Sequence, residues 1–457
     1  MARTAADRFP PQIKFIIGNE GCERFSFYGM KNILTFFMIH YLLLKEPTAK
    51  ANYHLFVSAV YFFPLLGGLL ADRLFGKYRT ILYLSLVYCA GHACLAIFDQ
   101  EPTGFYAGLF LIALGSGGIK PCVSALVGDQ FSDENKHLLR KVFQLFYWIV
   151  NFGSFFASAL IPKTLEWFGP KVAFGIPGGL MLLATVILFA GRAHYVDVPP
   201  VGRDPHAFLR VVWSGLRARQ RGQGIFEAAQ ASHPPHAVEA ARAVAAVLLI
   251  FAPIPFFWAL FDQKGSTWIV QASAMDLTFG SWKLAPSQVM ALNPALVMLL
   301  IPLTNYFLYP TLEKRGIPLR PLGRMGVGMA LAALAFVIVG LMQLVLDGGQ
   351  QLSVLWQLLP YAVLTLGEVL LSTTGLEFAY SQAPPHMKST IMSFWNLTVT
   401  FGNLLTALVS RLEIFSGAAQ FFFYAALLFV STGAFALLAR GYRDKDYYQH
   451  GERSSAA

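Results

Sequence analysis

The chain has 457 residues, of which 56% are hydrophobic and 13% are charged. This composition excludes an ordinary soluble globular protein, in which about a quarter of the residues are charged, and it predicts an all-α protein that crosses a membrane many times. The net charge of +10 is compatible with nucleic-acid binding, but the placement of the basic residues, described below, excludes that partner.

Twelve apolar runs are long enough to cross about 30 Å of hydrocarbon. They are residues 13–44, 51–71, 79–98, 104–127, 139–161, 172–192, 243–263, 287–310, 322–346, 353–380, 388–410 and 417–440. A segment rich in Arg, Pro and His separates the sixth run from the seventh. The expected organisation is therefore an N-terminal six-helix bundle (1–192), a cytoplasmic linker (193–242), a C-terminal six-helix bundle (243–440) and a cytoplasmic tail (441–457).

The basic residues predict the orientation of these runs. Most of the 35 Lys and Arg residues lie on the side that carries both ends of the chain and the linker. By the positive-inside rule this side is cytoplasmic, with anionic lipids as its partner. Within the linker, residues 207–216 form either an amphipathic surface helix or part of a disordered tether.

The four cysteines fall within the predicted spans without a CxxC motif or a mixed Cys/His cluster. We therefore expect neither a disulfide nor a metal site. The short polar segment 1–14 leads directly into the first apolar run, so no cleaved signal peptide is expected.

The first run carries an unusual concentration of charge. On a helix, six of its residues share one arc of about 140°: Glu20, Glu23, Arg24, Phe27, Tyr28 and Lys31. Charged groups inside a membrane are costly, so they pair with one another or line a water-filled route for an ion or a substrate. The alternative is a pair of structural salt bridges that holds a helix bundle together.

Further polar residues interrupt later runs. Lys120 lies beside Pro121 in the fourth run, and its depth favours a position facing a cavity. Asn151 lies among aromatic residues, where it makes either an interhelical hydrogen bond or a ligand contact. Glu368 has no base in its own run, so we expect Lys120 as its partner. His54 begins the second run, and by position alone it is an interfacial residue that can bind a proton near neutral pH.

The sequence resembles the proton-dependent oligopeptide transporter family over all twelve predicted helices. The family's first-helix signature is matched by Glu20-x-x-Glu23-Arg24-Phe25 followed by Tyr28-Gly29. The other matching motifs are Tyr53-His54, Asp72-Arg73 with Gly76, Lys120-Pro121, Phe143 to Gly153, Phe257-Trp258 with Asp262-Gln263, and Leu292-Asn293-Pro294. The resemblance implies the major facilitator fold, in which two six-helix bundles enclose a site near the middle of the membrane.

The resemblance also implies residue roles. The proton-coupling residues would be Glu20, Glu23, Arg24, His54, Asp262 and Glu368. The peptide-binding residues would be Phe27, Tyr28, Lys31, Tyr61, Lys120, Asn151, Trp258, Asn293, Glu368, Ser372 and Trp395. Lys31 and Asp262 would form an outer gate, and Lys120 and Glu368 an inner one.

The implied function is proton-coupled import of di- and tripeptides by alternating access, in a monomer of the cell (inner) membrane that has no cofactor. Three residues depart from the family pattern, since Phe27 replaces a tyrosine, Lys31 an arginine and Thr373 a proline. The alternative function is a transporter of the same fold for nitrate, a sugar or a drug. A membrane enzyme is not expected, because the chain has no HExxH, GxSxG or Asp-rich motif.

Overall fold

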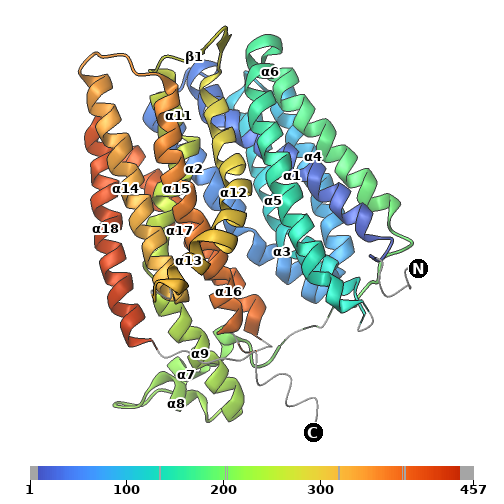
Figure 1. The fold of residues 1–457 in the computed structure, drawn as a ribbon. Helices are drawn as coiled ribbons and strands as arrows, with labels where there is room; N and C mark the ends of the chain where they lie inside the picture. The colour runs from blue at the N-terminus through green and yellow to red at the C-terminus, as the bar shows by residue number, and fades with distance from the viewer. Residues whose placement is uncertain are drawn as a thin grey trace.

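The computed structural model describes residues 9–132, 135–200, 202, 204–316, 320–382, 384 and 387–442. In these residues the chain forms two halves of packed helices joined by a linker (Figure 1). The first half consists of α1 (Ile13–His40), α2 (Glu46–Phe62), α3 (Pro64–Leu70), α4 (Lys77–Ile97), α5 (Pro102–Asp129) and α6 (Leu139–Ala190). A π-helical turn at Ala71–Phe75 extends α3, and a 3₁₀ turn at Lys136–Leu138 precedes α6.

The second half is more often interrupted. Its helices are α9 (Pro235–Phe251), α10 (Ile254–Phe261), α11 (Thr267–Ser273), α12 (Leu292–Leu303), α13 (Tyr309–Lys314), α14 (Pro321–Asp347), α15 (Leu358–Glu368), α16 (Thr374–Ser381), α17 (Lys388–Leu412) and α18 (Gly417–Gly441). The connecting 3₁₀ and π-helical turns are Asp262–Gly265, Pro286–Ala291, Thr304–Leu308, Val354–Gln357 and Val369–Thr373. One antiparallel hairpin, β1 (Thr278–Phe279) and β2 (Trp282–Lys283), follows α11.

The helix α6 contains two membrane crossings. It has 52 residues, and a straight helix of that length would be about 78 Å long, far more than the ~30 Å of hydrocarbon in a bilayer. Gly169 breaks it with φ 78° and ψ 179°, a conformation that favours glycine, and Pro170 begins the next helical stretch.

The count of crossings agrees with the sequence. Nine helices of the described chain are long and apolar enough to span a membrane, and the bent pair formed by α9 with α10 and α11 makes a tenth. The break in α6 adds one crossing, and α1 adds another, since it has 28 residues although it is charged. The described residues therefore contain the twelve predicted crossings.

The linker is partly helical. It contains α7 (Phe208–Ala218) and α8 (Ile225–Ala229), so residues 207–216 mostly form a helix rather than a disordered tether. The next helix, α9, begins at Pro235, earlier than the expected residue 243. Its first turns already pack in the core, because Ala237, Val238 and Ala241 are buried there.

Glu101 caps the beginning of α5, outside the apolar crossing. Its carboxylate accepts hydrogen bonds from the backbone N–H groups of Thr103 at 3.2 Å and Gly104 at 2.6 Å. These donors, chiefly that of Gly104, hold the pKa of Glu101 below its usual value. Such a cap satisfies N–H groups that have no partner within the helix.

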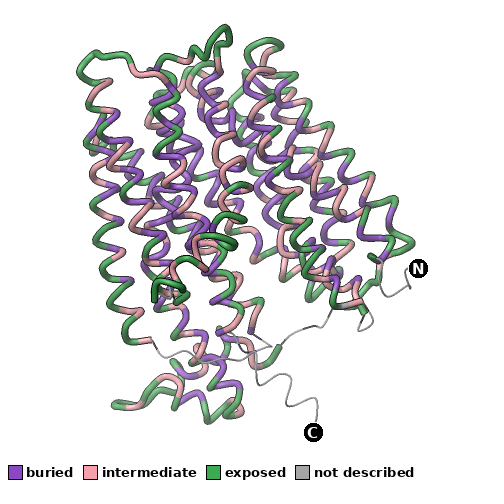
Figure 2. The backbone as a smooth tube through the Cα atoms, viewed as in Figure 1, coloured by how far each residue is buried: buried purple, intermediate pink, exposed green. Residues whose placement is uncertain are grey.

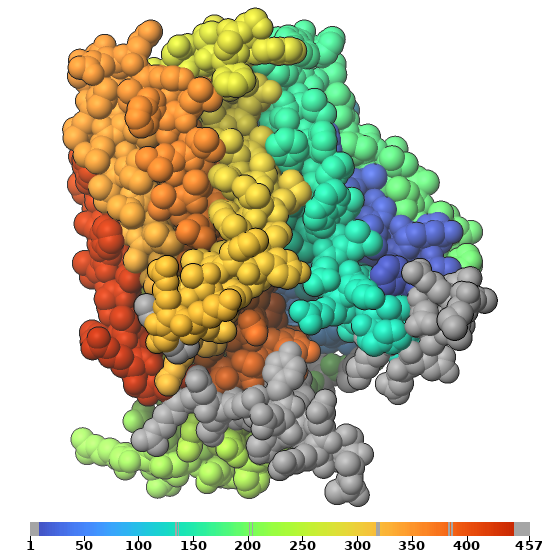
Figure 3. Space-filling view, in the orientation of Figure 1, coloured from blue at the N-terminus to red at the C-terminus, as the bar shows by residue number. Residues whose placement is uncertain are grey.

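The two halves do not meet evenly along their length. We call the end with β1 and β2 the hairpin end, and the end with α7 and α8 the linker end. The halves lie together at the hairpin end and splay apart toward the linker end (Figure 1). Buried residues follow the facing sides of the helices, whereas exposed residues cover the loops and much of the outer surface (Figure 2). The space-filling view shows the second half against the first along the upper part of one face (Figure 3).

Candidate functional site

The charged face of α1 is buried inside the protein. Arg24 Nε lies 2.8 Å from Glu20 Oε1 and 2.5 Å from Glu23 Oε2. The three residues are 8%, 5% and 1% exposed. One guanidinium therefore faces two carboxylates, and a second cation or a bound proton is needed to balance the cluster.

Lys31 joins the two halves near the hairpin end. Its Nζ lies 3.4 Å from Asp262 Oδ1, as predicted for the outer gate. One turn further along α1, the Thr35 hydroxyl donates to the carbonyl of Gly265 at 2.7 Å. Gly265 is required here, because an added Cβ would overlap the Tyr53 hydroxyl.

His54 extends this contact, and its position differs from the interfacial one expected from sequence. It is fully buried, because α2 packs against α17 and covers it. Its Nδ1 lies 2.7 Å from Asn403 Oδ1, and its Nε2 lies 2.8 Å from Ser266 Oγ. Asn403 Nδ2 in turn donates to Asp262 Oδ2 at 2.8 Å. Polar contacts therefore connect His54, Asn403, Asp262 and Lys31 across the two halves.

The expected Lys120–Glu368 pair is not formed in this conformation. Lys120 Nζ lies instead over the rings of Tyr61, at 4.2 Å, and Phe27, at 4.8 Å, and the ion pairs between described residues do not include it. The splaying of the halves toward the linker end (Figure 1) explains the difference, since Lys120 and Glu368 belong to opposite halves.

Glu368 has a different set of partners. Asn293 Nδ2 donates to Glu368 Oε2 at 2.8 Å and to Thr365 Oγ1 at 3.1 Å. Lys264 Nζ donates to Asn293 Oδ1 at 2.9 Å, so a buried cation lies one residue away from Glu368. Lys264 was not among the residues predicted from the sequence, although it follows the Asp262-Gln263 motif at the end of a predicted span.

The remaining predicted residues form two groups. Phe27 and Tyr28 are in edge contact, with ring centroids 5.4 Å apart, beside the Tyr61 and Lys120 contact. In the second half, Trp258 and Trp395 are in edge contact at 6.3 Å. The indole N–H of Trp258 and the hydroxyl of Ser372 are buried and have no hydrogen-bond partner among the described residues.

Asn151 and Thr373 each make a hydrogen bond within their own helical segment. Asn151 Nδ2 donates to the carbonyl of Tyr147 in its own helix at 3.0 Å, rather than to another helix of the described chain. The Val369–Thr373 turn widens the helix directly after Glu368 without the family's proline, and the Thr373 hydroxyl donates to the carbonyl of Val369 at 2.6 Å.

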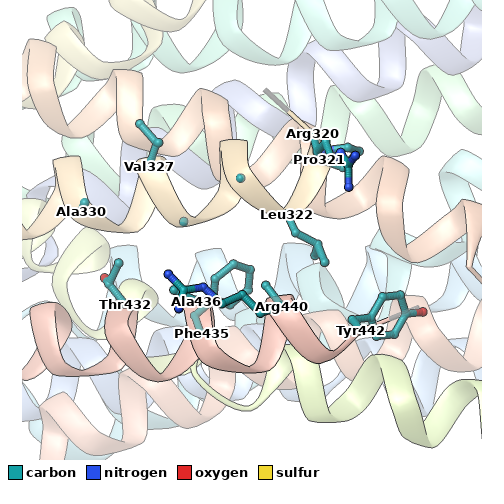
Figure 4. A pocket seen from close by; sticks show the side chains of 13 residues that line it. Arg320, Pro321, Leu322, Val327, Ala330, Thr432, Phe435, Ala436, Arg440 and Tyr442 are labelled. Carbon is teal, nitrogen blue, oxygen red and sulfur yellow. The ribbon is translucent and has the colours of Figure 1, made fainter. Parts of the chain in front are cut away.

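A surface groove lies apart from this site. A groove of about 580 Å³ lies between α14 and α18, lined among others by Pro321, Val327, Phe435 and Arg440 (Figure 4). It contains none of the residues predicted to bind a peptide or a proton.

Comparison with known proteins adds independent findings. Residues 78–415 match the POT family. The chain is 37% identical to solute carrier family 15 member 2 of Mus musculus, over 85% of this chain and 56% of that protein. It is 28% identical to peptide transporter 3 of Caenorhabditis elegans, over 95% of this chain and 93% of that protein. The chain thus spans about half the length of the mouse relative.

A solved structure shows the same architecture. The crystal structure of the POT family transporter PepTSo is 48% identical in sequence and superposes with a TM-score of 0.92, over 96% of this chain and all of that one. The fold expected from the sequence, two bundles of six membrane-spanning helices, is confirmed by this agreement and by the observed crossings.

Proposed function

The chain belongs to the POT family, and from this premise we propose that it is a proton-coupled symporter that imports di- and tripeptides by alternating access. The relatives named above include a peptide transporter and a solute carrier. The activity proposed for this chain also rests on its own buried charges.

The observation that carries the proposal is the presence of acids and bases on both halves of a membrane-embedded bundle. The first half contributes the Glu20, Glu23 and Arg24 cluster and Lys120, and the second half contributes Glu368 with its neighbouring amide and Lys264. Groups of this kind are expensive in hydrocarbon and mark substrate and ion routes. A peptide carries one ammonium and one carboxylate, so it can pair with both kinds of charge at once.

The two ends of the peptide have different partners in this proposal. Its carboxylate binds Lys120 and Lys31, and its ammonium binds Glu368 with the help of Asn293 and Asn151. The ring contacts of Lys120 support the first assignment, because a cation held by aromatic faces accepts a carboxylate without displacing another one. Six further side chains shape the pockets for peptide side chains: Phe27, Tyr28, Tyr61, Trp258, Ser372 and Trp395.

Proton and peptide are coupled through the same charges. When the peptide carboxylate binds a lysine, an acid that this lysine had stabilised gains affinity for a proton. Arg24 faces both Glu20 and Glu23, so it can stabilise one carboxylate while the other is protonated. His54 contacts Asp262 through Asn403, and a proton on His54 would compete with Lys31 for the acid and loosen the outer gate.

The conformation fits one state of the cycle. The Lys31–Asp262 contact closes the hairpin end, while the halves splay apart at the linker end. With the linker and both termini on the cytoplasmic side, this is an inward-facing state. In the outward-facing state we expect Lys120 and Glu368 to approach and close the linker end.

The surface of the linker supports this orientation. The helix α7 exposes Leu209, Trp213 and Leu216, with Arg210 and Arg217 beside them. An apolar strip bordered by arginines is suited to the surface of a membrane that contains anionic lipids. We place the protein in the cell (inner) membrane as a monomer.

The proton gradient supplies enough energy for this work. One proton that crosses ~100 mV releases about 2.3 kcal/mol, and one pH unit adds about 1.4 kcal/mol. Because each 1.4 kcal/mol is a factor of ten, a neutral peptide can be accumulated roughly several hundredfold.

Uptake into liposomes tests the proposal. Purified protein in liposomes with an acidic exterior should accumulate labelled di-alanine, and unlabelled di-alanine and tri-alanine should compete. Nitrate and glucose at the same concentration should not compete. Accumulation of nitrate or glucose instead of the peptide would contradict the proposed substrate class.

A further inference from the structure

Several polar groups are buried without partners on the side of Glu23 that faces the interior of the first half. Within the described part of the chain, neither carboxylate oxygen of Glu23 accepts a hydrogen bond, although Oε2 lies within ion-pair distance of Arg24. The hydroxyls of Tyr88, in α4, and Ser116, in α5, also have no partner among these residues, and both side chains are 0% exposed. A buried polar group without a partner is costly, so a group of them calls for an explanation.

His92, one turn after Tyr88 in α4, fixes the geometry of this region. The Ser26 hydroxyl donates its only proton to the carbonyl of Pro177, at 2.6 Å. His92 Nε2 lies 2.9 Å from the same oxygen, so Nε2 carries the proton and donates to Ser26. The other ring nitrogen, Nδ1, is then an acceptor, and it is buried with no partner in the part of the chain that the structure describes. His92 is therefore held as one neutral tautomer between α1 and α6.

The ring of His92 in turn holds Tyr88. The two rings are stacked, with centroids 5.0 Å apart and an interplanar angle of 21°. The Tyr88 hydroxyl interacts electrostatically with Glu23 and is close to Ser116 and Ser26. A hydroxyl can donate one hydrogen bond and accept others, so the Tyr88 hydroxyl is able to donate to the Glu23 carboxylate while it accepts from Ser116.

We propose that Tyr88 is a positioning residue for proton coupling, which donates a hydrogen bond to Glu23 when Glu23 is charged, and that Ser26 and His92 hold it in place. This inference rests on the proposed function. We call the chain of side chains from Glu23 through Tyr88 and Ser26 to His92 the polar relay. A phenylalanine would fill the same space as Tyr88 without burying an unpaired hydroxyl, which is why the hydroxyl points to a role beyond packing.

Other charged groups also face Glu23, and the relay acts together with them. Arg24 and Glu20 face it from α1, and Lys120 faces it from α5. The helix α6 approaches α1 through Gly153, which has no titratable group, and Tyr61 of α2 faces Arg24. The Tyr88 hydroxyl is neutral, so its removal leaves the net charge around Glu23 unchanged.

The test is the pH dependence of di-alanine uptake by Tyr88→Phe in liposomes. Without the donor, the charged form of Glu23 is less stable, so the carboxyl binds its proton at higher pH. The pH of half-maximal uptake should rise by about one unit, as expected for one hydrogen bond to a charged group. An unchanged pH profile in Tyr88→Phe would overturn the proposal.

Tyr361→Phe is the matched control. Tyr361 is 0% exposed and its hydroxyl has no partner in the described ranges, but it lies in the second half against Trp268. Its loss should leave the half-maximal pH where it is in the wild type. An equal shift in both variants would also overturn the proposal, because it would show that any buried tyrosine hydroxyl has this effect.

Substitutions of His92 separate positioning from packing. His92→Gln loses the stacked ring but keeps an N–H group that can reach Ser26, so it should shift the pH profile less than His92→Leu. His92→Leu removes the N–H group and the stacked ring, and it should shift the profile in the same direction as Tyr88→Phe. These two variants decide the proposal if Tyr88→Phe does not fold, and equal profiles for both would contradict it.

Peptide counterflow without a pH gradient tests the proposed function and the proposed role of Tyr88 separately. Tyr88→Phe should exchange labelled for unlabelled di-alanine at the wild-type rate, because the relay acts on the proton alone. Wild-type protein that exchanges no peptide would contradict the proposed function itself. Wild-type exchange with no pH shift in Tyr88→Phe would contradict the relay alone.

Discussion

Three lysines of the candidate site have different contacts. Lys31 lies beside a carboxylate, Lys264 lies beside an amide oxygen and over the Phe261 ring, and Lys120 lies over two aromatic rings. A cation–π contact is worth about 0.5–2 kcal/mol, less than a buried ion pair loses when one partner is removed. A peptide carboxylate that binds Lys120 therefore replaces weaker contacts than one that binds Lys31.

Lys120→Ala should remove the main positive partner of the peptide carboxylate. A lost hydrogen bond to a charged group is worth about 1.5–3 kcal/mol, so the apparent affinity for di-alanine should fall roughly 10- to 100-fold. The measurement is the concentration dependence of uptake. Lys163→Ala is the control, because Lys163 pairs with Glu166 of its own helix on the surface. Wild-type affinity in Lys120→Ala would show that Lys120 only packs.

At the scale of elements, the closed hairpin end depends on contacts between helices of different halves. The helix α2 packs along α17, where the Ser58 hydroxyl donates to the carbonyl of Thr400 at 2.9 Å. The Lys31–Asp262 contact lies beside this packing. Removal of one member of a buried ion pair leaves an uncompensated charge, which costs about 3–5 kcal/mol.

Lys31→Met should therefore favour the state in which the hairpin end is open. Spin labels at Leu43 and Leu412, both exposed near that end, should report a longer mean distance in a cysteine-free background. Lys50→Met is the control, because Lys50 pairs with Glu46 inside α2 and not across the halves. Equal distance distributions in Lys31→Met and the wild type would show that this pair does not hold the gate.

The crossing of α3 over α5 gives a second prediction at this scale. A Cβ at Gly67 would overlap the backbone of Gly118, whereas a Cβ at Gly68 meets no atom within 4 Å. Gly67→Ala should destabilise the protein by about 1–3 kcal/mol, and Gly68→Ala should leave it unchanged or slightly more stable. Thermal unfolding in detergent compares the two. Equal melting temperatures would contradict the close approach of these helices.

At the scale of the whole molecule, the sequence predicts which segments cross the membrane better than it predicts which side chains of different helices are in contact. The apolar runs place all twelve crossings, because the thickness of the bilayer fixes the length of each. They do not reveal that His54 meets Asn403, or that Lys264 meets Asn293, because periodicity within one helix cannot identify the helix that faces it. The pairing of Lys120 with Glu368 could not be tested from sequence, since it depends on which end of the molecule is closed.

In the proposed mechanism, the peptide and the proton share one set of buried charges. The most direct measurement of this claim is the pH inside liposomes, followed with a trapped dye, when di-alanine is added outside without a pre-formed pH gradient and with an inside-negative membrane potential. Wild-type protein should acidify the lumen as peptide enters, and Glu23→Gln should not, although Glu166→Gln should behave like the wild type. Acidification by Glu23→Gln at the wild-type rate, or peptide entry without any acidification by the wild type, would contradict the account.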